Sequence, residues 1–368
     1  MSKYKLSVII PTFNTGVFLH ESLGSIINQS IGFENVEVIL VDDKSSDPLT
    51  LSIIDDYVSK YSNIKVIYLE ENSGFPGRPR NVGIDASTSD YVIVMDHDDS
   101  YEIDAFEHLY NTITKENADV VICNFNQVFK DGSIPFKSLF GDVSSIKVEN
   151  IEENKKLLQI PAAIWTRLFR KSFLKKHNIR FLEGMLAEDV YVGVNSLLNA
   201  NGIVYLNSYY GYNYKTRDTD EDKSTIHIRN KKYIDAILNG FLNISSMIEE
   251  QNKEKYSDDI FKPHLTSWLY TIVLSNTNKE ERKQLFKKAS NLYKKRYVDD
   301  PYFKGRYNKL VNYILNNQFD QAVNESIKLQ SIEENMNVKL VNEIKENNKL
   351  INKTKNKFKK SLKKIFKN

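Results

Sequence analysis

Apolar runs alternate with stretches of helical spacing over the first third of the chain. Runs rich in β-branched residues predict five strands, at residues 6–10, 36–41, 64–69, 91–95 and 119–123. Between them, apolar positions recur at helical spacing, as at Leu19, Leu23 and Ile26, and a further helix is predicted over residues 101–116. Strands that alternate with helices predict βαβ units and a mainly parallel sheet in an α/β domain.

The remainder of the chain has a different pattern. Residues 226–330 alternate apolar positions with Lys, Asn and Glu at helical spacing, which predicts a helical appendage with Pro263 and Pro301 as helix breakers. Residues 331–368 fit a loose heptad and predict a coiled-coil-like helix with a basic amphipathic tail. The expected domains are therefore residues 1–225, 226–330 and 331–368.

Acidic residues gather where the fourth predicted strand ends. The run from Tyr91 to Met95 stops at Asp96, Asp98 and Asp99. Open α/β sheets place their ligands at the carboxyl ends of strands, and an Asp-x-Asp pair suits a hard divalent cation such as Mn²⁺ or Mg²⁺. An Asp-rich turn without a site is the alternative interpretation.

Composition narrows the class of protein. With 41% hydrophobic and 27% charged residues, the chain is typical of a globular protein, and no apolar stretch approaches the length of a membrane span. The start of the chain leads directly into a strand, so we expect a cytoplasmic location. The single cysteine, Cys123, lies in an apolar run and is expected in the core.

The net charge of +3 conceals a division of charge along the chain. Nine lysines and no acidic residue lie between Lys349 and Asn368, which leaves 42 basic against 48 acidic residues before that tail. A mildly acidic body argues against a nucleic-acid-binding core. The tail predicts peripheral binding to an anionic membrane surface at the inner face of the cell membrane, and a solvated lysine tail is the alternative.

Six stretches, taken in their order and spacing, resemble glycosyltransferase family 2, whose members have the GT-A nucleotide-sugar fold. The resemblance covers about residues 5–225, and its stretches are Ser7–Asn14, Val41–Asp47, Asn72–Asn81, Met95–Asp99, Trp165–Arg170 and Ala187–Asp189. The third and sixth stretches look most like those of bacterial enzymes that glycosylate wall teichoic acid. Related capsule and surface-polysaccharide transferases share most of them.

The resemblance implies a role for each matching residue. For a UDP-sugar donor it implies a nucleotide pocket, two contacts to the uracil ring, arginines near the diphosphate and an aspartate beside the ribose. By this resemblance, the nucleotide pocket is lined by Pro11, Thr12, Phe13 and Asn14, and the uracil ring is contacted by Asp43 and Asn72. The arginines near the diphosphate are Arg78, Arg80 and Arg217, and the aspartate beside the ribose is Asp96. Asp98, with Asp96, would hold Mn²⁺ or Mg²⁺, and His97 between them is interpreted as structural.

Sugar transfer also requires a group that deprotonates the acceptor hydroxyl. The resemblance assigns this role to Asp189. Glu188 and Asp189 are adjacent at a predicted helix start, residues 187–198, so they point in different directions and one of them faces the substrate. An acidic first helical turn is the alternative interpretation. A single in-line displacement would invert the anomeric centre.

Acceptor candidates come from flat side chains that suit sugar rings. Trp165, Tyr212 and Tyr214 are the aromatic candidates, and Glu188 is the acidic one. Core packing is the alternative for each aromatic ring.

The expected function is a metal-dependent inverting hexosyl- or N-acetylhexosaminyltransferase. It would move sugar from a UDP-sugar to a cell-surface glycopolymer, such as teichoic acid or capsule, or to its lipid-linked precursor. A catalytically silent relative that binds nucleotide sugars beside another transferase is the alternative, and a homo-oligomer is possible through the predicted coil. A nucleotide-dependent oxidoreductase is disfavoured because the Gly-x-Gly-x-x-Gly turn after the first strand is missing.

Overall fold

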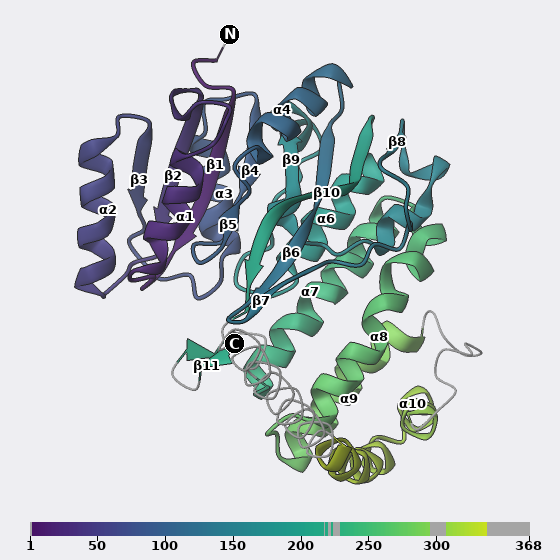
Figure 1. Cartoon of the computed structure of the whole chain (residues 1–368). Helices are drawn as coiled ribbons and strands as arrows, with labels where there is room; N and C mark the ends of the chain where they lie inside the picture. The colour runs from purple at the N-terminus through teal and green to yellow at the C-terminus, as the bar shows by residue number, and fades with distance from the viewer. Residues whose placement is uncertain (1, 217, 220–221, 224–228, 295–306, 337–368) are drawn as a thin grey trace, which may run out of the picture. The chain divides into compact units, whose positions relative to one another are not determined.

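The computed structural model of the 368-residue chain describes residues 2–216, 218–219, 222–223, 229–294 and 307–336 (Figure 1). The chain divides into two compact units. One contains Met1–Ile228 and Asp235–His264, and the other contains Arg229–Ile234 and Leu265–Asn368. The three domain boundaries expected from the sequence remain a prediction.

The first unit is built on a ten-stranded sheet. The order along its main path is β3-β2-β1-β4-β9-β6-β10-β5, with β7 beside β6 and β8 beside β10. Its strands are β1 (Leu6–Thr12), β2 (Val36–Asp42), β3 (Ile64–Tyr68), β4 (Tyr91–Val94), β5 (Ser100–Tyr101), β6 (Val120–Phe129), β7 (Gly132–Pro135), β8 (Ile146–Val148), β9 (Arg167–Arg170) and β10 (Ile203–Lys215). A separate ribbon pairs β11 (Asp218–Thr219) with β12 (Asp222–Lys223).

Strand direction confirms the predicted α/β class and adds one feature. Strands β3, β2, β1 and β4 are parallel neighbours, and β6 is parallel to β10. Strand β9 is inserted between β4 and β6 and runs antiparallel to both. All five predicted strands are present, as β1 to β4 and β6, whereas the sequence pattern did not indicate β9.

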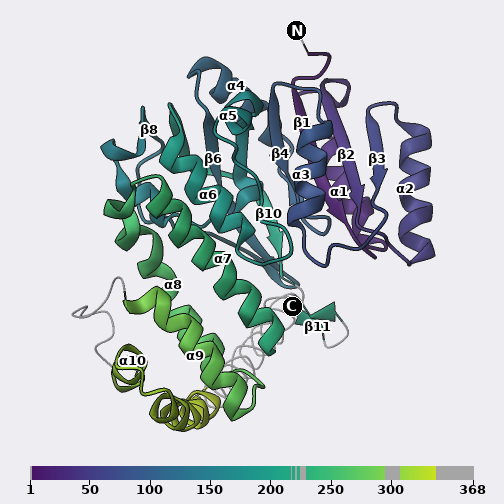
Figure 2. The ribbon, with the colours of Figure 1, turned by 180° about the vertical axis from the view of Figure 1, so that it is seen from behind.

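Helices cover both faces of this sheet. In Figures 1 and 2, α1 lies on one face, and α3 and α6 lie on the other. The helices of the unit are α1 (Phe18–Ile27), α2 (Pro48–Lys60), α3 (Gly77–Ala86), α4 (Ala105–Lys115), α5 (Lys171–Lys176), α6 (Glu188–Asn199), most of α7 (Lys231–Glu250) and the start of α8 (Ser257–Val273). Short 3-10 turns occupy Phe33–Asn35, Ile151–Glu153, Lys155–Gln159, Ile164–Thr166 and Glu254–Tyr256.

Local sequence signals explain several of these elements. The Asp47 carboxylate accepts from the Leu49 and Thr50 amides at 3.2 and 3.0 Å, so it caps α2 ahead of Pro48. All seven residues of β1 and of β2 are buried, as expected for strands covered on both faces. Cys123 is buried as well, and burial raises its pKa to about 12.

Pro263 does not break a helix, in contrast to the prediction. It lies inside α8, where the preceding residues Ile260 and Phe261 are buried. Burial of an apolar face therefore outweighs the missing backbone donor at this position. Pro301 lies outside the described residues.

The second unit is helical in its described part. It contains the end of α8, α9 (Lys279–Lys294), α10 (Asn308–Leu315) and a helix over residues 319–336. Arg282 is buried and donates to the Ser275 carbonyl and the Gln330 side chain, at 2.9 Å each. The predicted heptad and basic tail fall mainly on residues 337–368, outside the described part. None of the described helices is long and apolar enough to cross a membrane.

Candidate active site

The predicted donor crevice lies at the carboxyl ends of β1, β2 and β4. Thr12 pairs with Asp42 at the end of β1 and β2, and the Met95 amide donates to the Ile9 carbonyl at 2.9 Å. The turn Asp96–Asp99 therefore follows β4 beside the last residues of β1. This is the edge at which open α/β sheets bind ligands.

Contacts to β1 and to α1 hold this turn in place. The His97 ring nitrogen Nδ1 lies 3.3 Å from the Pro11 carbonyl oxygen, and the His97 carbonyl accepts from Ser22 Oγ at 2.5 Å. Pro11 and Thr12 are buried, whereas Phe13 is 46% exposed. Of the first-strand candidates, Phe13 is thus the one that presents a large apolar side chain to solvent.

The two residues expected near the uracil ring lie together. Asn72 Nδ2 donates to the Asp43 carbonyl at 2.8 Å. The buried Asp43 carboxylate accepts from the Ser73 amide at 2.9 and 3.1 Å and from Ser73 Oγ at 2.8 Å. A carboxylate offers about four lone-pair sites, so Asp43 retains capacity for a further donor.

Asn14 has a different part from the one expected. Its backbone is left-handed, with φ of 47°, a conformation that Asn tolerates. Its side-chain oxygen accepts from the Ser46 and Asp47 amides, both at 2.9 Å. The carboxamide therefore holds the loop between β2 and α2, and the place of Asn14 in the nucleotide pocket stays a prediction.

Arg80 links the aspartate turn to the start of α6. Its side chain is buried and donates to Asp96 Oδ1 at 2.7 Å and to Glu188 Oε1 at 2.8 Å, while Nε has no partner within the described structure. Burial opposes the charge of Arg80, but Asp96 and Glu188 outweigh it and raise the arginine pKa. Two residues that are far apart in sequence, Asp96 and Glu188, are therefore held by one cation.

The pair Glu188-Asp189 opens α6 after a left-handed residue, Ala187, with φ of 62°. Glu188 is 5% exposed and faces Arg80, whereas Asp189 is half-buried and accepts from its neighbour, the Val190 amide, at 2.7 Å. Glu188 is thus engaged by Arg80, and its expected contact with an acceptor stays a prediction.

Both carboxyl groups have raised pKa values, and burial is the main cause. The Asp189 carboxylate adds to the effect at Glu188, and Arg80 opposes it at both residues. Together with Asp96, Glu188 and Asp189 make three carboxylates whose charges act on the Arg80 cation. A base with a raised pKa in this crevice is suited to proton abstraction near neutral pH.

Asp99 is a buried carboxyl group that the sequence did not separate from its neighbours. It accepts from the Tyr212 hydroxyl and from the Lys215 amide, each at 2.8 Å. Burial, followed by the charges of Asp96 and Asp98, raises the pKa of Asp99 to about 8. Because both of its oxygens accept protein donors, Asp99 anchors the turn to β10.

Tyr212 is fully buried, so it does not contact an acceptor, which corrects its expected role. Besides donating to Asp99, its hydroxyl accepts from the Asp96 amide at 3.3 Å. Its ring stacks on Trp165, with centroids 4.2 Å apart, and Trp165 stacks in turn on Tyr214 at 5.7 Å. Trp165 and Tyr214 are half-buried and remain the aromatic acceptor candidates.

The remaining donor candidates differ in how fully the structure describes them. Arg78 is half-buried in the first turn of α3, and among the described residues it has no ion pair. It is therefore the more available cation for a diphosphate, because Arg80 is already engaged. Arg217 lies outside the described residues.

The carboxylates of the turn fit part of a divalent-cation site. Asp98 is half-buried, and one oxygen of Asp96 is engaged by Arg80. Within the described residues, no group of three or more His, Cys, Asp or Glu side chains is placed to hold a metal. Oxygen donors from one or two carboxylates, completed by substrate phosphates, are the usual ligand set for Mg²⁺, so the residues fit a cation that shares its ligands with a diphosphate.

Arg167 was not singled out from the sequence, although it lies in one of the matching stretches. It is 1% exposed, and it donates to the Gly193 and Pro161 carbonyls at 2.9 and 3.2 Å. Burial lowers its pKa to about 10, and the nearby Asp189 charge opposes this shift. Arg167 therefore binds a carbonyl of α6 and places a cation near Asp189.

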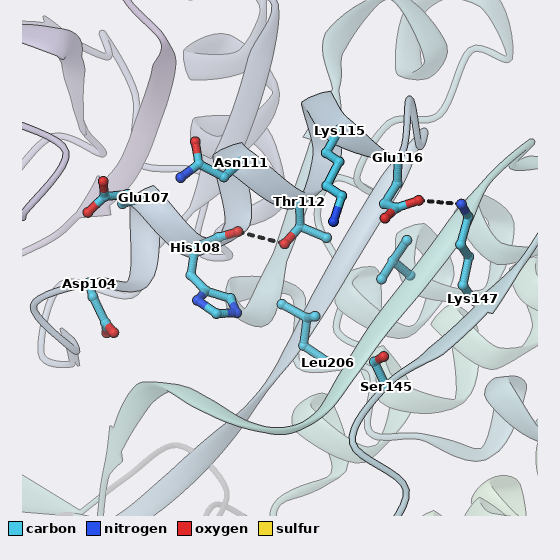
Figure 3. A pocket seen from close by; sticks show the side chains of 11 residues that line it. Asp104, Glu107, His108, Asn111, Thr112, Lys115, Glu116, Ser145, Lys147 and Leu206 are labelled. Atoms are coloured by element: carbon cyan, nitrogen blue, oxygen red, sulfur yellow. Dashed lines mark hydrogen bonds and ion pairs between the residues drawn. The ribbon is translucent and has the colours of Figure 1, made fainter.

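A groove beside α4 shares no residue with the crevice. It has a volume of about 500 Å³ and mixes charges of both signs, including Glu107, Lys115 and the ion pair between Glu116 and Lys147 (Figure 3). This mixture favours no single class of ligand, and we assign none to it.

The sheet order and the acidic turn at the carboxyl ends of its strands define an α/β domain with the GT-A type of fold. The crystal structure of Staphylococcus aureus TarS 1–349 in complex with UDP-GlcNAc has the same fold, with a TM-score of 0.69 and 23% identity over 89% of this chain and 91% of that one. Residues 7–177 match the sequence profile described as Glycosyl transferase family 2. Over these residues the chain is similar to glycosyltransferase family 2, as the resemblance predicted.

Curated relatives are similar over most of this chain. The poly(ribitol-phosphate) beta-glucosyltransferase of Bacillus spizizenii is 29% identical over 290 residues, which are 78% of this chain and 44% of that protein. The poly(ribitol-phosphate) beta-N-acetylglucosaminyltransferase TarP of Staphylococcus aureus is 32% identical over 210 residues, 56% of this chain and 62% of that protein. The chain thus spans less than half the length of the first of these relatives.

Proposed function

We propose that this chain is a metal-dependent, inverting glycosyltransferase that moves a sugar from a UDP-sugar to a hydroxyl group of a cell-surface glycopolymer. The observation that carries the proposal is the bridge from Asp96 through Arg80 to Glu188. It fixes the donor-side turn beside the start of α6, where Asp189 lies. This bridge supports the proposal because an in-line transfer requires the donor and the base to be close to each other.

The relatives support the choice of donor and acceptor. Their names specify glucosyl or N-acetylglucosaminyl transfer to poly(ribitol-phosphate), and the TarS structure contains UDP-GlcNAc. We therefore propose UDP-glucose or UDP-GlcNAc as the donor class and a polyol-phosphate polymer, such as a teichoic acid, as the acceptor class.

The donor is proposed to bind along the edge of β1, β2 and β4. Asp43 and Asn72 lie together and would contact the uracil ring, and Asp96 would lie beside the ribose. Arg78, which has no ion pair among the described residues, would meet the diphosphate. Arg80 would act by positioning Asp96 and Glu188 rather than by binding phosphate, because its two terminal nitrogens already donate to them.

The acceptor hydroxyl is proposed to lose its proton to Asp189. One oxygen of this carboxylate accepts from the Val190 amide, which orients the group and leaves the second oxygen for the substrate. Attack on the anomeric carbon from the side opposite the leaving diphosphate would give the inverted product. Trp165 and Tyr214 would hold the acceptor chain.

Asp98, with the second oxygen of Asp96, would hold a Mn²⁺ or Mg²⁺ ion. Such a cation, when bound, neutralises the charge that develops on the leaving diphosphate.

Transfer assays would test the proposal. The purified chain is incubated with each UDP-sugar, with and without MnCl₂, and with poly(ribitol phosphate), while released UDP and labelled polymer are measured. We expect acceptor-dependent UDP release that EDTA abolishes. Tight UDP binding without any release would instead support the silent nucleotide-sugar-binding partner, and no binding of any UDP-sugar would refute both.

Peripheral membrane association and a homo-oligomer remain proposals from the sequence. Both depend on residues 331–368, of which residues 337–368 lie outside the described part. The lysine-rich tail supports an anionic-lipid contact, since each lysine near such a surface contributes about 1 kcal/mol at most. An enzyme acting on a lipid-linked acceptor would benefit from that location.

A further inference from the structure

Helix α7 approaches residues 182–187, the segment that leads to Asp189, at Gly240. An ideal Cβ placed on Gly240 would lie 2.0 Å from the Leu186 carbonyl oxygen and 3.1 Å from the Ala187 Cβ. Real Cβ atoms essentially never approach backbone oxygen so closely, so any side chain here would displace the segment. Gly240 and this segment belong to the same compact unit.

Two more contacts hold the same segment. On α3, a Cβ at Gly77 would lie 2.0 Å from the Leu182 carbonyl oxygen. On α7, the Asn243 side-chain nitrogen lies 3.5 Å from the Met185 sulfur. Residues 182–187 are therefore held from α3 at one end and from α7 at the other.

The segment requires such support because its last residue is strained. Ala187 has φ of 62°, and a left-handed conformation costs a non-glycine residue about 1–2 kcal/mol. Strained residues persist only where the surrounding structure holds them. Ala187 directly precedes Glu188 and Asp189, so its conformation sets the direction in which both carboxylates leave α6.

The glycine itself has a cost that packing must offset. Glycine in a helix interior is less favourable than alanine by about 1 kcal/mol. A second helical glycine, Gly24 in α1, has nothing within 4 Å of its ideal Cβ. The two positions share a helical backbone and differ in what a methyl group would meet.

We infer that Gly240 is a positioning residue for the proposed base, acting through Leu186 and Ala187, and this inference rests on the proposed function. Helix α7 lies beyond the residues 7–177 that match the family profile. It also lies in the part that the sequence assigned to a helical appendage. The inference makes α7 part of the catalytic apparatus.

The test compares Gly240→Ala with the matched control Gly24→Ala. For each variant we measure kcat for acceptor-dependent transfer, the Kd for UDP in MnCl₂ by calorimetry, and the melting temperature. We expect kcat of Gly240→Ala to fall at least tenfold, because a shift of about 1 Å at a reacting group can reduce a rate about 100-fold. The UDP Kd should change less than kcat, because Glu188 reaches the donor-side residue Asp96 only through Arg80, and Gly24→Ala should change neither value.

An unchanged kcat in Gly240→Ala would overturn the inference. So would an equal loss of UDP affinity and kcat, or the same loss in Gly24→Ala. If Gly240→Ala does not fold, Asn243→Ala decides: a lower kcat with unchanged UDP Kd supports the inference, and wild-type kcat overturns it.

A structural measurement separates this inference from the proposed function. If the wild-type chain transfers no sugar, the proposed function fails. Crystal structures of the wild type and of Gly240→Ala then decide the inference: displacement of residues 185–189 supports it, and superimposable segments overturn it.

Discussion

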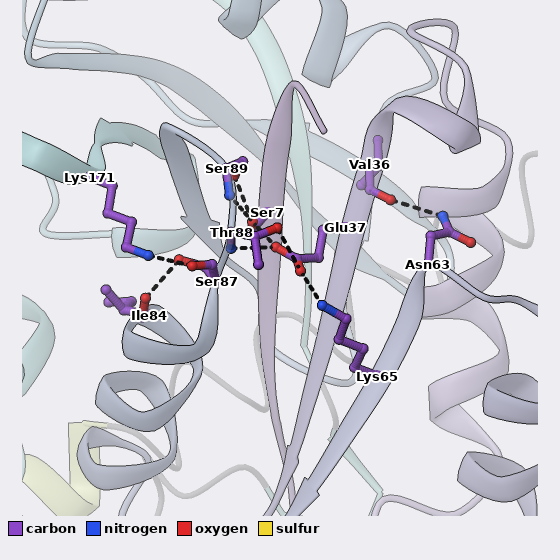
Figure 4. A network of polar contacts seen from close by, with 10 residues as sticks. All are labelled: Ser7, Val36, Glu37, Asn63, Lys65, Ile84, Ser87, Thr88, Ser89 and Lys171. Carbon is purple, nitrogen blue, oxygen red and sulfur yellow. Dashed lines mark hydrogen bonds and ion pairs between the residues drawn. The ribbon is translucent and has the colours of Figure 1, made fainter. Parts of the chain in front are cut away.

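The two ends of the sheet in the first unit differ in how their carboxylates are neutralised. At the amino ends of the strands, Glu37 is fully buried, and both of its oxygens are satisfied (Figure 4). One oxygen accepts from Ser7 Oγ at 2.5 Å and the Thr88 amide at 2.8 Å, and the other accepts from Lys65 at 2.8 Å and Thr88 Oγ1 at 3.0 Å. At the carboxyl ends, Asp96, Glu188 and Asp189 surround the Arg80 cation.

The difference separates a structural network from a site. Where every lone pair has a donor, the charged form is favoured, and the group stabilises the fold. Where buried carboxylates outnumber cations, as at Glu188 and Asp189, burial raises their pKa values and like charges lie close together, which a bound cation or a substrate proton can relieve. The same sheet therefore carries a completed network at one end and an incomplete one at the other.

The largest effect is expected at the incomplete end. Asp189→Asn should reduce kcat about 10²–10⁴-fold, the usual contribution of a general base, with UDP affinity nearly unchanged. Asp98→Ala should instead remove the manganese-dependent part of UDP binding. Steady-state transfer and calorimetry distinguish the two outcomes, and Asp189→Asn with more than about a tenth of the wild-type kcat would refute the proposed base.

At the completed end the expected effect is on stability. Glu37→Gln should lower the free energy of unfolding by about 1–3 kcal/mol, because it leaves buried donors poorly matched. The UDP Kd should not change, since Glu37 lies at the opposite end of the strands. Urea unfolding measures the loss, with the exposed Glu70→Gln as a control expected to stay within about 0.5 kcal/mol. A loss of UDP affinity in Glu37→Gln would erase the distinction between the ends.

A smaller effect on UDP binding is expected from substitution of a buried tyrosine on β10, and a second tyrosine on the same strand serves as its control. Tyr212 and Tyr205 are both buried, and each hydroxyl donates to a side chain, Asp99 at 2.8 Å and Asn124 at 2.5 Å. Replacing either tyrosine by Phe should cost about 1 kcal/mol of stability. Tyr212→Phe alone should also weaken manganese-dependent UDP binding severalfold, because it frees the turn that carries Asp98. Equal binding by the two variants would show that Tyr212 has no part in the site.

The sequence could predict elements and motifs better than it could predict partners. Strand β4 and the acidic turn follow from local pattern, because an apolar run and a cluster of aspartates are visible in adjacent residues. The engagement of Arg80 by Glu188 joins residues 108 positions apart, and no local pattern encodes it. For the same reason the sequence left Tyr212 open between an acceptor contact and core packing, whereas in the fold it is buried and its hydroxyl donates to Asp99.

Gly24 and Gly240 also show that packing partners cannot be predicted from local sequence. Gly24 and Gly240 both interrupt helical patterns, and composition treats them alike. What distinguishes them is the Leu186 carbonyl beside Gly240, a contact between residues that are 54 positions apart in the sequence. Sequence reasoning therefore assigned α7 to an appendage, whereas packing joins it to the proposed base.

The smallest expected effect is the pH dependence of the Glu37 network. Burial alone would raise the pKa of Glu37, but hydrogen bonds from Lys65, Ser7 and Thr88 outweigh it and lower the pKa below the ordinary 4.5. Between the folded pKa and 4.5, the unfolded chain binds more protons than the folded one, so stability rises with pH there. The contribution of the Glu37 charge is complete above pH 4.5 and is lost as the pH falls through the folded value.

The difference in unfolding free energy between the wild type and Glu37→Gln should therefore shrink on acidification. Urea unfolding at about pH 6 and about pH 3.5 measures it, and the comparison cancels the titration of distant carboxylates because effects at independent sites add. The small difference for Glu70→Gln should stay constant over the same range. If the difference in unfolding free energy between the wild type and Glu37→Gln stays constant or grows toward low pH, the Glu37 carboxylate is not stabilised as an anion. The two ends of the sheet would then no longer differ in how they stabilise carboxylates.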